Sequence, residues 1–327
     1  MKKLLSIFLC ALMVFSLASF AGCGKAQLKF GVGTYASAKL KANAADGENG
    51  STKASVNIAA VLLDANGKVV DCKIDCAEYE LGFTADGKAV AVEGEISTKY
   101  EKGDNYGMKK YGKAEKEWFE QIDALVGVIK GKTLDEVKAL VATESKGSDA
   151  VVNAGCTIAV ADYIKAVERA IENAKESEAT EGNTLKIGTV STQSTPKDAT
   201  DEGDGTNEIN TSITAAVLDK DNKVVAAYTD AVQVKATFNQ KGEFTGKDGE
   251  ITGKRDLGDN YGMKKYGKAE KEWYEQAEAF DAALKGKTAA DIAKLVTADG
   301  KGAEELQTAG CTIGVSDMVK AAEKAAK

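Results

Sequence analysis

The stretch GDNYGMKKYGKAEKEW, residues 103–118, occurs twice in this chain of 327 residues, and residues 258–273 repeat it letter for letter. The two copies lie 155 positions apart, and the same offset aligns the run Ala-Gly-Cys-Thr at 154–157 with 309–312. A repeat of this length is too long for a solenoid unit. The sequence therefore predicts two copies of one domain, residues 26–174 and 184–327, joined by a polar linker at 175–183.

Within each copy the predicted strands precede the predicted helices. A first strand begins at 28–31. Apolar and polar residues alternate in two further stretches, Ser55–Leu63 and Val69–Phe83, and Asn66-Gly67 between them is typical of a hairpin turn. A further strand is expected at Val90–Ile96. This order favours an antiparallel sheet in each copy.

Three helices are expected to cover each sheet. In the first copy they span Lys113–Lys130, then Thr133 to about Val141 behind a capping box, and finally Asp162–Lys175. Trp118 falls at helical spacing with other apolar residues and is expected in the core. The fold class is therefore α+β, as two tandem homologous domains, each long enough for a core of its own.

The N-terminus has the pattern of an export signal. Lys2 and Lys3 precede an uncharged apolar run, so residues 1–22 are predicted to be a signal peptide. The run ends in Phe20-Ala-Gly-Cys23, which resembles the lipobox of bacterial lipoproteins, with phenylalanine where leucine is usual. The resemblance implies a lipid on Cys23 that anchors the protein at the extracellular face of the cell membrane. The alternative is a plain secretory signal in which Cys23 is incidental.

Composition excludes several classes of function. The chain has no histidine, which removes imidazole-based nucleophile pairs and histidine zinc sites. The formal net charge of −7 becomes −9 once Lys2 and Lys3 are removed with the signal. A protein with this negative charge has no overall attraction for nucleic acid or for anionic membrane lipids. Its membrane contact is therefore expected only through the lipid attached to Cys23.

Four cysteines remain after the lipobox: Cys72, Cys76, Cys156 and Cys311. Their spacing matches no metal site. Cys72 and Cys76 lie about 13 Å apart on a predicted strand at 3.3 Å per residue, too far for a disulfide between them without a bend. Both are expected to fill small apolar spaces.

The identical 16-residue stretch is a candidate ligand loop. It places aromatic rings and lysines among glycines before a predicted helix, a combination that can stack on a flat or sugar-like ligand and offer cations to a phosphate. The alternative is that the tyrosines pack the helix entry on the sheet while the lysines are solvated. The candidate residues are Tyr106, Lys109 and Tyr111 in the first copy and Tyr261, Lys264 and Tyr266 in the second.

The Ala-Gly-Cys-Thr run precedes the last predicted helix of each copy. Here it resembles the Ser/Thr-Gly-Ala-Thr motif of the FMN-binding domain family, with cysteine in place of alanine and alanine in place of the first Ser/Thr. The resemblance implies that a flavin transferase esterifies Thr157 and Thr312 with FMN, next to Gly155 and Gly310. The alternative is a buried strand, Cys-Thr-Ile-x-Val, in which threonine is a strand former.

Two functional hypotheses follow. In the first, the protein is a Gram-positive cell-surface lipoprotein with two FMN-binding-like domains and a membrane redox partner, an extracellular electron carrier without catalysis of its own. In the second, it is a lipoprotein without flavin that binds a ligand or serves as a structural module. An enzyme has the least support, because no carboxylate pair and no nucleophile–base pair stands out in the sequence.

Overall fold

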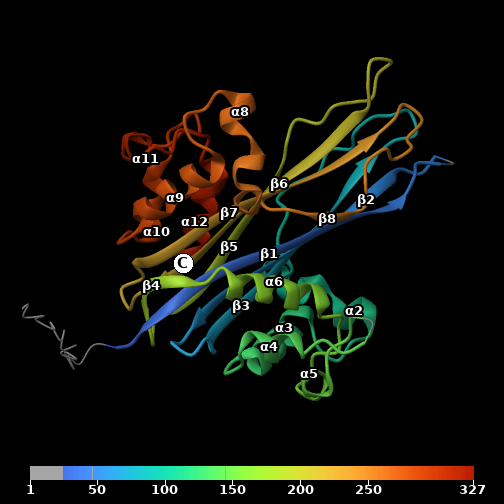
Figure 1. Ribbon diagram of the computed structural model, residues 1–327. Helices are drawn as coiled ribbons and strands as arrows, with labels where there is room; N and C mark the ends of the chain where they lie inside the picture. The colour runs from blue at the N-terminus through green and yellow to red at the C-terminus, as the bar shows by residue number, and fades with distance from the viewer. Residues whose placement is uncertain (1–24, 46, 144) are drawn as a thin grey trace, which may run out of the picture.

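The structure is a computed structural model that describes residues 25–45, 47–143 and 145–327 (Figure 1). The predicted signal peptide and Cys23 lie outside the described residues. In the described part of the chain, no helix has the length and apolar character needed to span a membrane.

Each repeat opens with three antiparallel strands joined by short connections. They are β1 (Gln27–Ala42), β2 (Gly50–Leu63) and β3 (Val69–Phe83) in the first repeat, and β5 (Thr184–Gln193), β6 (Gly205–Leu218) and β7 (Val224–Phe238) in the second. The predicted turn at Asn66-Gly67 joins β2 and β3, with the Asp64 carboxylate accepting the N–H of Asn66 at 2.8 Å. The strand expected at Val90–Ile96 is absent from this part of the structure. Its backbone instead bonds to side chains of the second repeat, as Gln193 Oε1 accepts the Val92 N–H at 2.9 Å.

Twelve α-helices follow the strands in the described residues, six in each repeat. They are α1 (Lys99–Lys102), α2 (Met108–Gly112), α3 (Trp118–Ile129), α4 (Leu134–Lys138), α5 (Asp149–Asn153), α6 (Ala161–Glu172), α7 (Lys254–Leu257), α8 (Met263–Gly267), α9 (Trp273–Leu284), α10 (Ala289–Ile292), α11 (Glu304–Ala309) and α12 (Ser316–Ala325). Short 3₁₀ turns occupy Gly103–Tyr106, Gly258–Tyr261 and Ala293–Leu295. The predicted α+β class is confirmed.

Three helix predictions need correction. The helix expected from Thr133 to about Val141 ends at Lys138. The helix expected from Lys113 begins only at Trp118, because Lys113 has a left-handed backbone, with φ of 55°, that ends α2. The last helix of the first repeat ends at Glu172, before the expected Lys175, which begins the next strand. The capping box at Thr133 and the buried position of Trp118 are both confirmed.

The elements form four layers, with helices outside and the two sheets inside. α6 packs on β1 and β2, whereas α12 packs on β5 and β6, so the helices of the two repeats lie on opposite outer sides (Figure 1). Alternate strand residues divide between the two faces of each sheet. In β2, Ala59 and Val61 join the helix-covered core, while Val56 and Ile58 join a core between the sheets.

The segment 175–183, predicted as a linker, contains a strand. β4 (Lys175–Thr180) pairs antiparallel with β1, and Ala179 is buried between the two sheets. A short strand of the second repeat, β8 (Gly249–Ile251), pairs with β1 further along, where Ala36 faces Ile251. β1 therefore binds backbone from both repeats.

Contacts between the repeats are reciprocal. The Ala44 N–H donates to Gly242 O at 2.9 Å, and the equivalent Ala199 N–H donates to Gly87 O at 2.8 Å. Phe83 stacks on Phe238, its own counterpart, with ring centroids 5.0 Å apart. This pattern is the self-complementary contact of a twofold dimer, formed here within one chain.

Candidate functional site

Thr157 and Thr312 lie on exposed loops, each leading into the last helix of its repeat. The backbone N–H and the hydroxyl of Thr157 both donate to Gln121 Oε1, at 2.9 and 3.1 Å. Thr312 makes the same two bonds to Gln276 Oε1 at the same distances. The alternative of a buried strand is wrong, because residues 156–160 form a loop with one isolated bridge at Ala159.

Each threonine follows a glycine that the backbone requires. Gly155 has a φ of +99° and Gly310 a φ of +92°, in the left-handed region that disfavours residues with a side chain. The ammonium of Lys116 lies against Gly155, so that a Cβ there would stand 2.1 Å from Nζ. Lys271 lies in the same way against Gly310, at 1.9 Å from an added Cβ. A lysine therefore accompanies each threonine loop.

The four cysteines of the described residues are buried and free. Burial raises the pKa of the Cys156 and Cys311 thiols to about 11, and that of Cys72 to about 12. Thiols with such pKa values stay protonated near neutral pH and are poor nucleophiles. The cysteine in the Ala-Gly-Cys-Thr run therefore packs the loop on the core and leaves the threonine outside.

The tyrosines of the repeated stretch divide into two kinds. Tyr106 is half-buried, and its hydroxyl donates to Glu78 Oε1 at 3.4 Å. Tyr261 donates to Gln233 Oε1 at 3.2 Å. These two rings pack the helix entry on the sheet, the alternative that the sequence left open for them.

Tyr111 and Tyr266 instead project from α2 and α8, and each is 75% exposed. The Nζ atoms of Lys110 and Lys265 lie 4.9 Å above their rings. The lysines just before them in the motif are paired: Lys109 with Glu120 and Lys264 with Glu275, both at 2.5 Å. The exposed pairs remain open to a ligand.

One buried glutamine in each repeat connects the threonine loop with the tyrosine stretch. Gln121 accepts from Thr157 and donates through Nε2 to the sulfur of Met108, at the start of α2, at 3.9 Å. Gln276 connects Thr312 with Met263 in the same way. The two motifs picked out in the sequence are thus neighbours in the structure. The glutamines lay within the predicted helix and carried no separate sequence signal.

Two buried lysines were missed by the sequence analysis. Lys99 and Lys254 open α1 and α7 and are only 7% and 9% exposed. Lys99 Nζ lies 5.8 Å from the Trp118 ring and 3.1 Å from Glu78 Oε2. Lys254 Nζ lies 5.6 Å from the Trp273 ring. The 155-residue offset aligns the two lysines, and that alignment was the signal available in the sequence.

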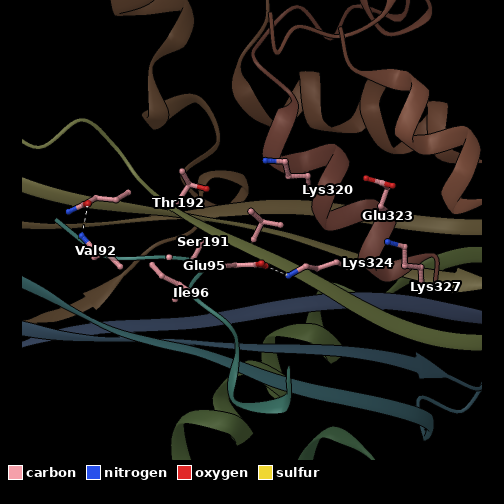
Figure 2. Close-up of a pocket in the computed structure, with 12 residues that line it drawn as sticks. Val92, Glu95, Ile96, Ser191, Thr192, Lys320, Glu323, Lys324 and Lys327 are labelled. Carbon is pink, nitrogen blue, oxygen red and sulfur yellow. Dashed lines mark hydrogen bonds and ion pairs between the residues drawn. The ribbon is translucent and has the colours of Figure 1, made fainter. Parts of the chain in front are cut away.

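A cleft of about 640 Å³ lies between the repeats. Figure 2 shows Glu95 from the first repeat facing Lys324 of α12 across it. Lys324 donates to Glu95 at 2.8 Å, to Glu101 at 2.7 Å and to Thr189 O at 3.1 Å. These bonds leave the Lys324 ammonium paired within the protein, and they link the two repeats.

Comparisons of the chain with protein-family models, with curated proteins and with solved structures find no match in any of the three.

Proposed function

We propose that this protein is a cell-surface lipoprotein that carries FMN as a phosphoester on Thr157 and Thr312 and transfers electrons outside the cell. The observation that supports the proposal is the exposure of both hydroxyls on loops of the same geometry, one in each repeat. A modifying enzyme needs such access. The proposal takes the lipid on Cys23 as the anchor at the extracellular face of the membrane.

The residues around each threonine suit a flavin phosphate. The Lys116 ammonium beside Gly155 offers a cation to the phosphate, and Lys271 does so beside Gly310. The backbone N–H of Thr157 donates to Gln121 independently of the hydroxyl. This bond can therefore keep the loop in place when the hydroxyl oxygen is esterified. Bound FMN would supply one- or two-electron transfer through its ring system. The partners implied are a flavin transferase and a membrane redox protein.

Intact mass tests the flavin. After co-expression with a flavin transferase, each modified threonine should add the mass of one FMN minus one water. The wild type should therefore gain two such increments. Thr157→Ala and Thr312→Ala should each lose one such increment, and the double variant both. Thr143→Ala, at an exposed threonine outside the motif, is the matched control and should keep both. An unmodified wild type, in cells where the same transferase modifies a known FMN-binding domain, would overturn the proposal.

The anchor has its own test. Cys23→Ala removes the only thiol in the lipobox-like segment, so the variant should be shed or remain unprocessed. Phase separation in detergent and mass spectrometry report the lipid. A processed, lipid-bearing Cys23→Ala protein would contradict the lipoprotein assignment.

A second candidate function is binding of a cell-wall polymer without flavin. The exposed Tyr111 and Tyr266 rings, each beneath a lysine, favour it, because such pairs stack on sugars and attract phosphate. Co-sedimentation with isolated cell-wall sacculi tests it. A double Tyr111→Ala, Tyr266→Ala variant should lose most of its binding, while Tyr100→Ala, at another exposed ring, should keep it. Equal sedimentation of all three proteins would exclude these rings.

A further inference from the structure

A cleft of about 390 Å³ opens in the second repeat, between the outer face of its sheet and the loop before α12. Lys254 and Trp273 line its buried part, together with Ser212 and Asn210 of β6. Asp299 and Asp317 line its more exposed part. The volume falls within the range of small-molecule sites.

The first repeat fills the equivalent space with a ring. Met318 lines the cleft, and the residue 155 positions earlier is Tyr163. Tyr163 is buried, and its hydroxyl accepts the indole N–H of Trp118 at 2.9 Å. With methionine in its place, the indole N–H of Trp273 has no hydrogen-bond acceptor among the described residues. The cleft therefore belongs to the second repeat and contains a donor without a partner.

The charge balance also differs between the repeats. Lys99 is paired with the Glu78 carboxylate at 3.1 Å, but Gln233 stands at the equivalent position in the second repeat. The Gln233 amide bonds instead to Tyr261 and Glu208. Within the described residues, Lys254 forms no ion pair. A buried ammonium without a counter-charge carries a desolvation cost that a bound anion would offset.

One more polar atom at the cleft lacks a partner. Asn210 Oδ1 is buried without a hydrogen bond, although the Asn210 side chain lines the cleft. An unpaired buried acceptor costs about 1–3 kcal/mol. This oxygen faces away from the open volume, so it is not a ligand contact in this arrangement. The half-buried carboxylate of Asp317 favours a ligand with a positive group on the same side, whereas the exposed Asp299 already lies 3.9 Å from Lys301 Nζ.

We propose that this cleft binds a small zwitterion with the chemistry of a free α-amino acid. Its carboxylate accepts from Lys254 Nζ and from the indole N–H of Trp273. Its ammonium group faces the carboxylate of Asp317. The apolar surface of Trp273 and Met318 is left for the ligand's side chain. This site is separate from the threonine loops, and it does not depend on flavin.

Calorimetric titration of the flavin-free protein with each of the twenty standard amino acids tests the site. At least one should bind, and its N-acetyl and its amide derivatives should each bind at least tenfold more weakly, because each lacks one charge. Absence of binding by all twenty would overturn the proposal. Equal binding of the N-acetyl derivative would overturn the role of the ammonium group.

Variants locate the binding. Met318→Tyr restores the ring of the first repeat and should abolish binding while leaving the protein folded, since Tyr163 is accommodated at the equivalent position. Lys254→Met should weaken binding at least tenfold. Tyr163→Met opens the equivalent space in the first repeat, where Glu78 already neutralises Lys99, and should leave the affinity and the number of sites unchanged. Unchanged binding in the Met318→Tyr protein would overturn the assignment to this cleft.

Discussion

Asp75 and Asp230 are buried carboxylates at equivalent positions in the two repeats. Asp75 accepts the backbone N–H of Cys76 at 2.7 Å and that of Tyr100, in α1, at 3.2 Å. Asp230 accepts those of Ala231 and Arg255 at 2.7 and 3.0 Å. Burial nevertheless raises the pKa of both carboxyls to about 6, because the loss of water outweighs these bonds. Each carboxylate orients the short helix that begins with a buried lysine.

These raised pKa values predict a pH dependence of stability. A carboxyl with a pKa of about 6 in the folded protein and 3.8 in the unfolded chain keeps its proton longer when folded. The free energy of unfolding should therefore increase as the pH falls from 7 to 5. No histidine titrates in this window. Denaturant unfolding at pH 5, 6 and 7 measures the slope.

Asp75→Asn keeps the acceptor oxygen and removes the charge, so the slope between pH 5 and 7 should become shallower. Asp123→Asn, at an exposed carboxyl, is the control and should leave the slope unchanged. A stability that rises with pH over this range in the wild type would contradict the prediction.

At the scale of elements, glycines set how closely a helix packs on its sheet. A Cβ on Gly31 would lie 2.0 Å from the backbone oxygen of Ala170 in α6, and one on Gly188 would lie 2.0 Å from that of Ala321 in α12. Gly31 and Gly33 of β1 therefore form a packing surface for α6. Only glycine allows this approach of backbone to backbone.

Gly31→Ala should destabilise the protein by about 1–3 kcal/mol, since α6 must move away from β1 to accommodate the methyl group. Gly127→Ala is the matched control, on the exposed side of α3 with nothing within 4 Å of the added Cβ. It should stabilise the protein by about 0.5–1 kcal/mol through helix propensity. Urea unfolding compares the two. A Gly31→Ala protein as stable as Gly127→Ala would refute the packing argument.

At the scale of the whole molecule, the two repeats share apolar cores between their sheets. Val56 and Ile58 of the first repeat pack in one cluster with Ile213 and Val232 of the second. The Tyr79 hydroxyl lies 3.1 Å from that of Thr211 inside the same interface. Each repeat has a core of its own beneath its helices, as its length predicts. The inner face of each sheet, however, is covered by the other repeat.

Separated repeats should therefore fail to behave as stable monomers. Residues 25–183 alone expose the inner face of their sheet, so we expect self-association or loss of cooperative unfolding. Mixing them with residues 184–327 should restore one cooperative transition. Sedimentation and thermal unfolding follow both outcomes. Two monomeric fragments, each with its own cooperative transition, would show instead that the repeats are independent domains.

Local sequence was sufficient for much of the fold and for part of the site. The turn at Asn66-Gly67, the strand Val69–Phe83 and the capping box at Thr133 depend on neighbouring residues, and all three were predicted. The strand expected at 90–96 was not found, because its backbone bonds to residues more than 100 positions away. The cleft beside Lys254 depends on the exchange of Tyr163 for Met318, which acquires meaning only when the two repeats are superposed.

The sequence by itself determined the duplication, the α+β class and the candidate loops at Thr157 and Thr312, because identity at a fixed offset and local periodicity are properties of the chain. Only the tertiary structure decided that β4 belongs to the sheet, that the repeats share the cores between their sheets and that Lys254 is buried without a counter-charge. The physical reason is that burial and backbone pairing are set by residues far apart in sequence. The polar composition of residues 175–180 is typical of a linker, and these residues form a strand because the edge of β1 is available for pairing.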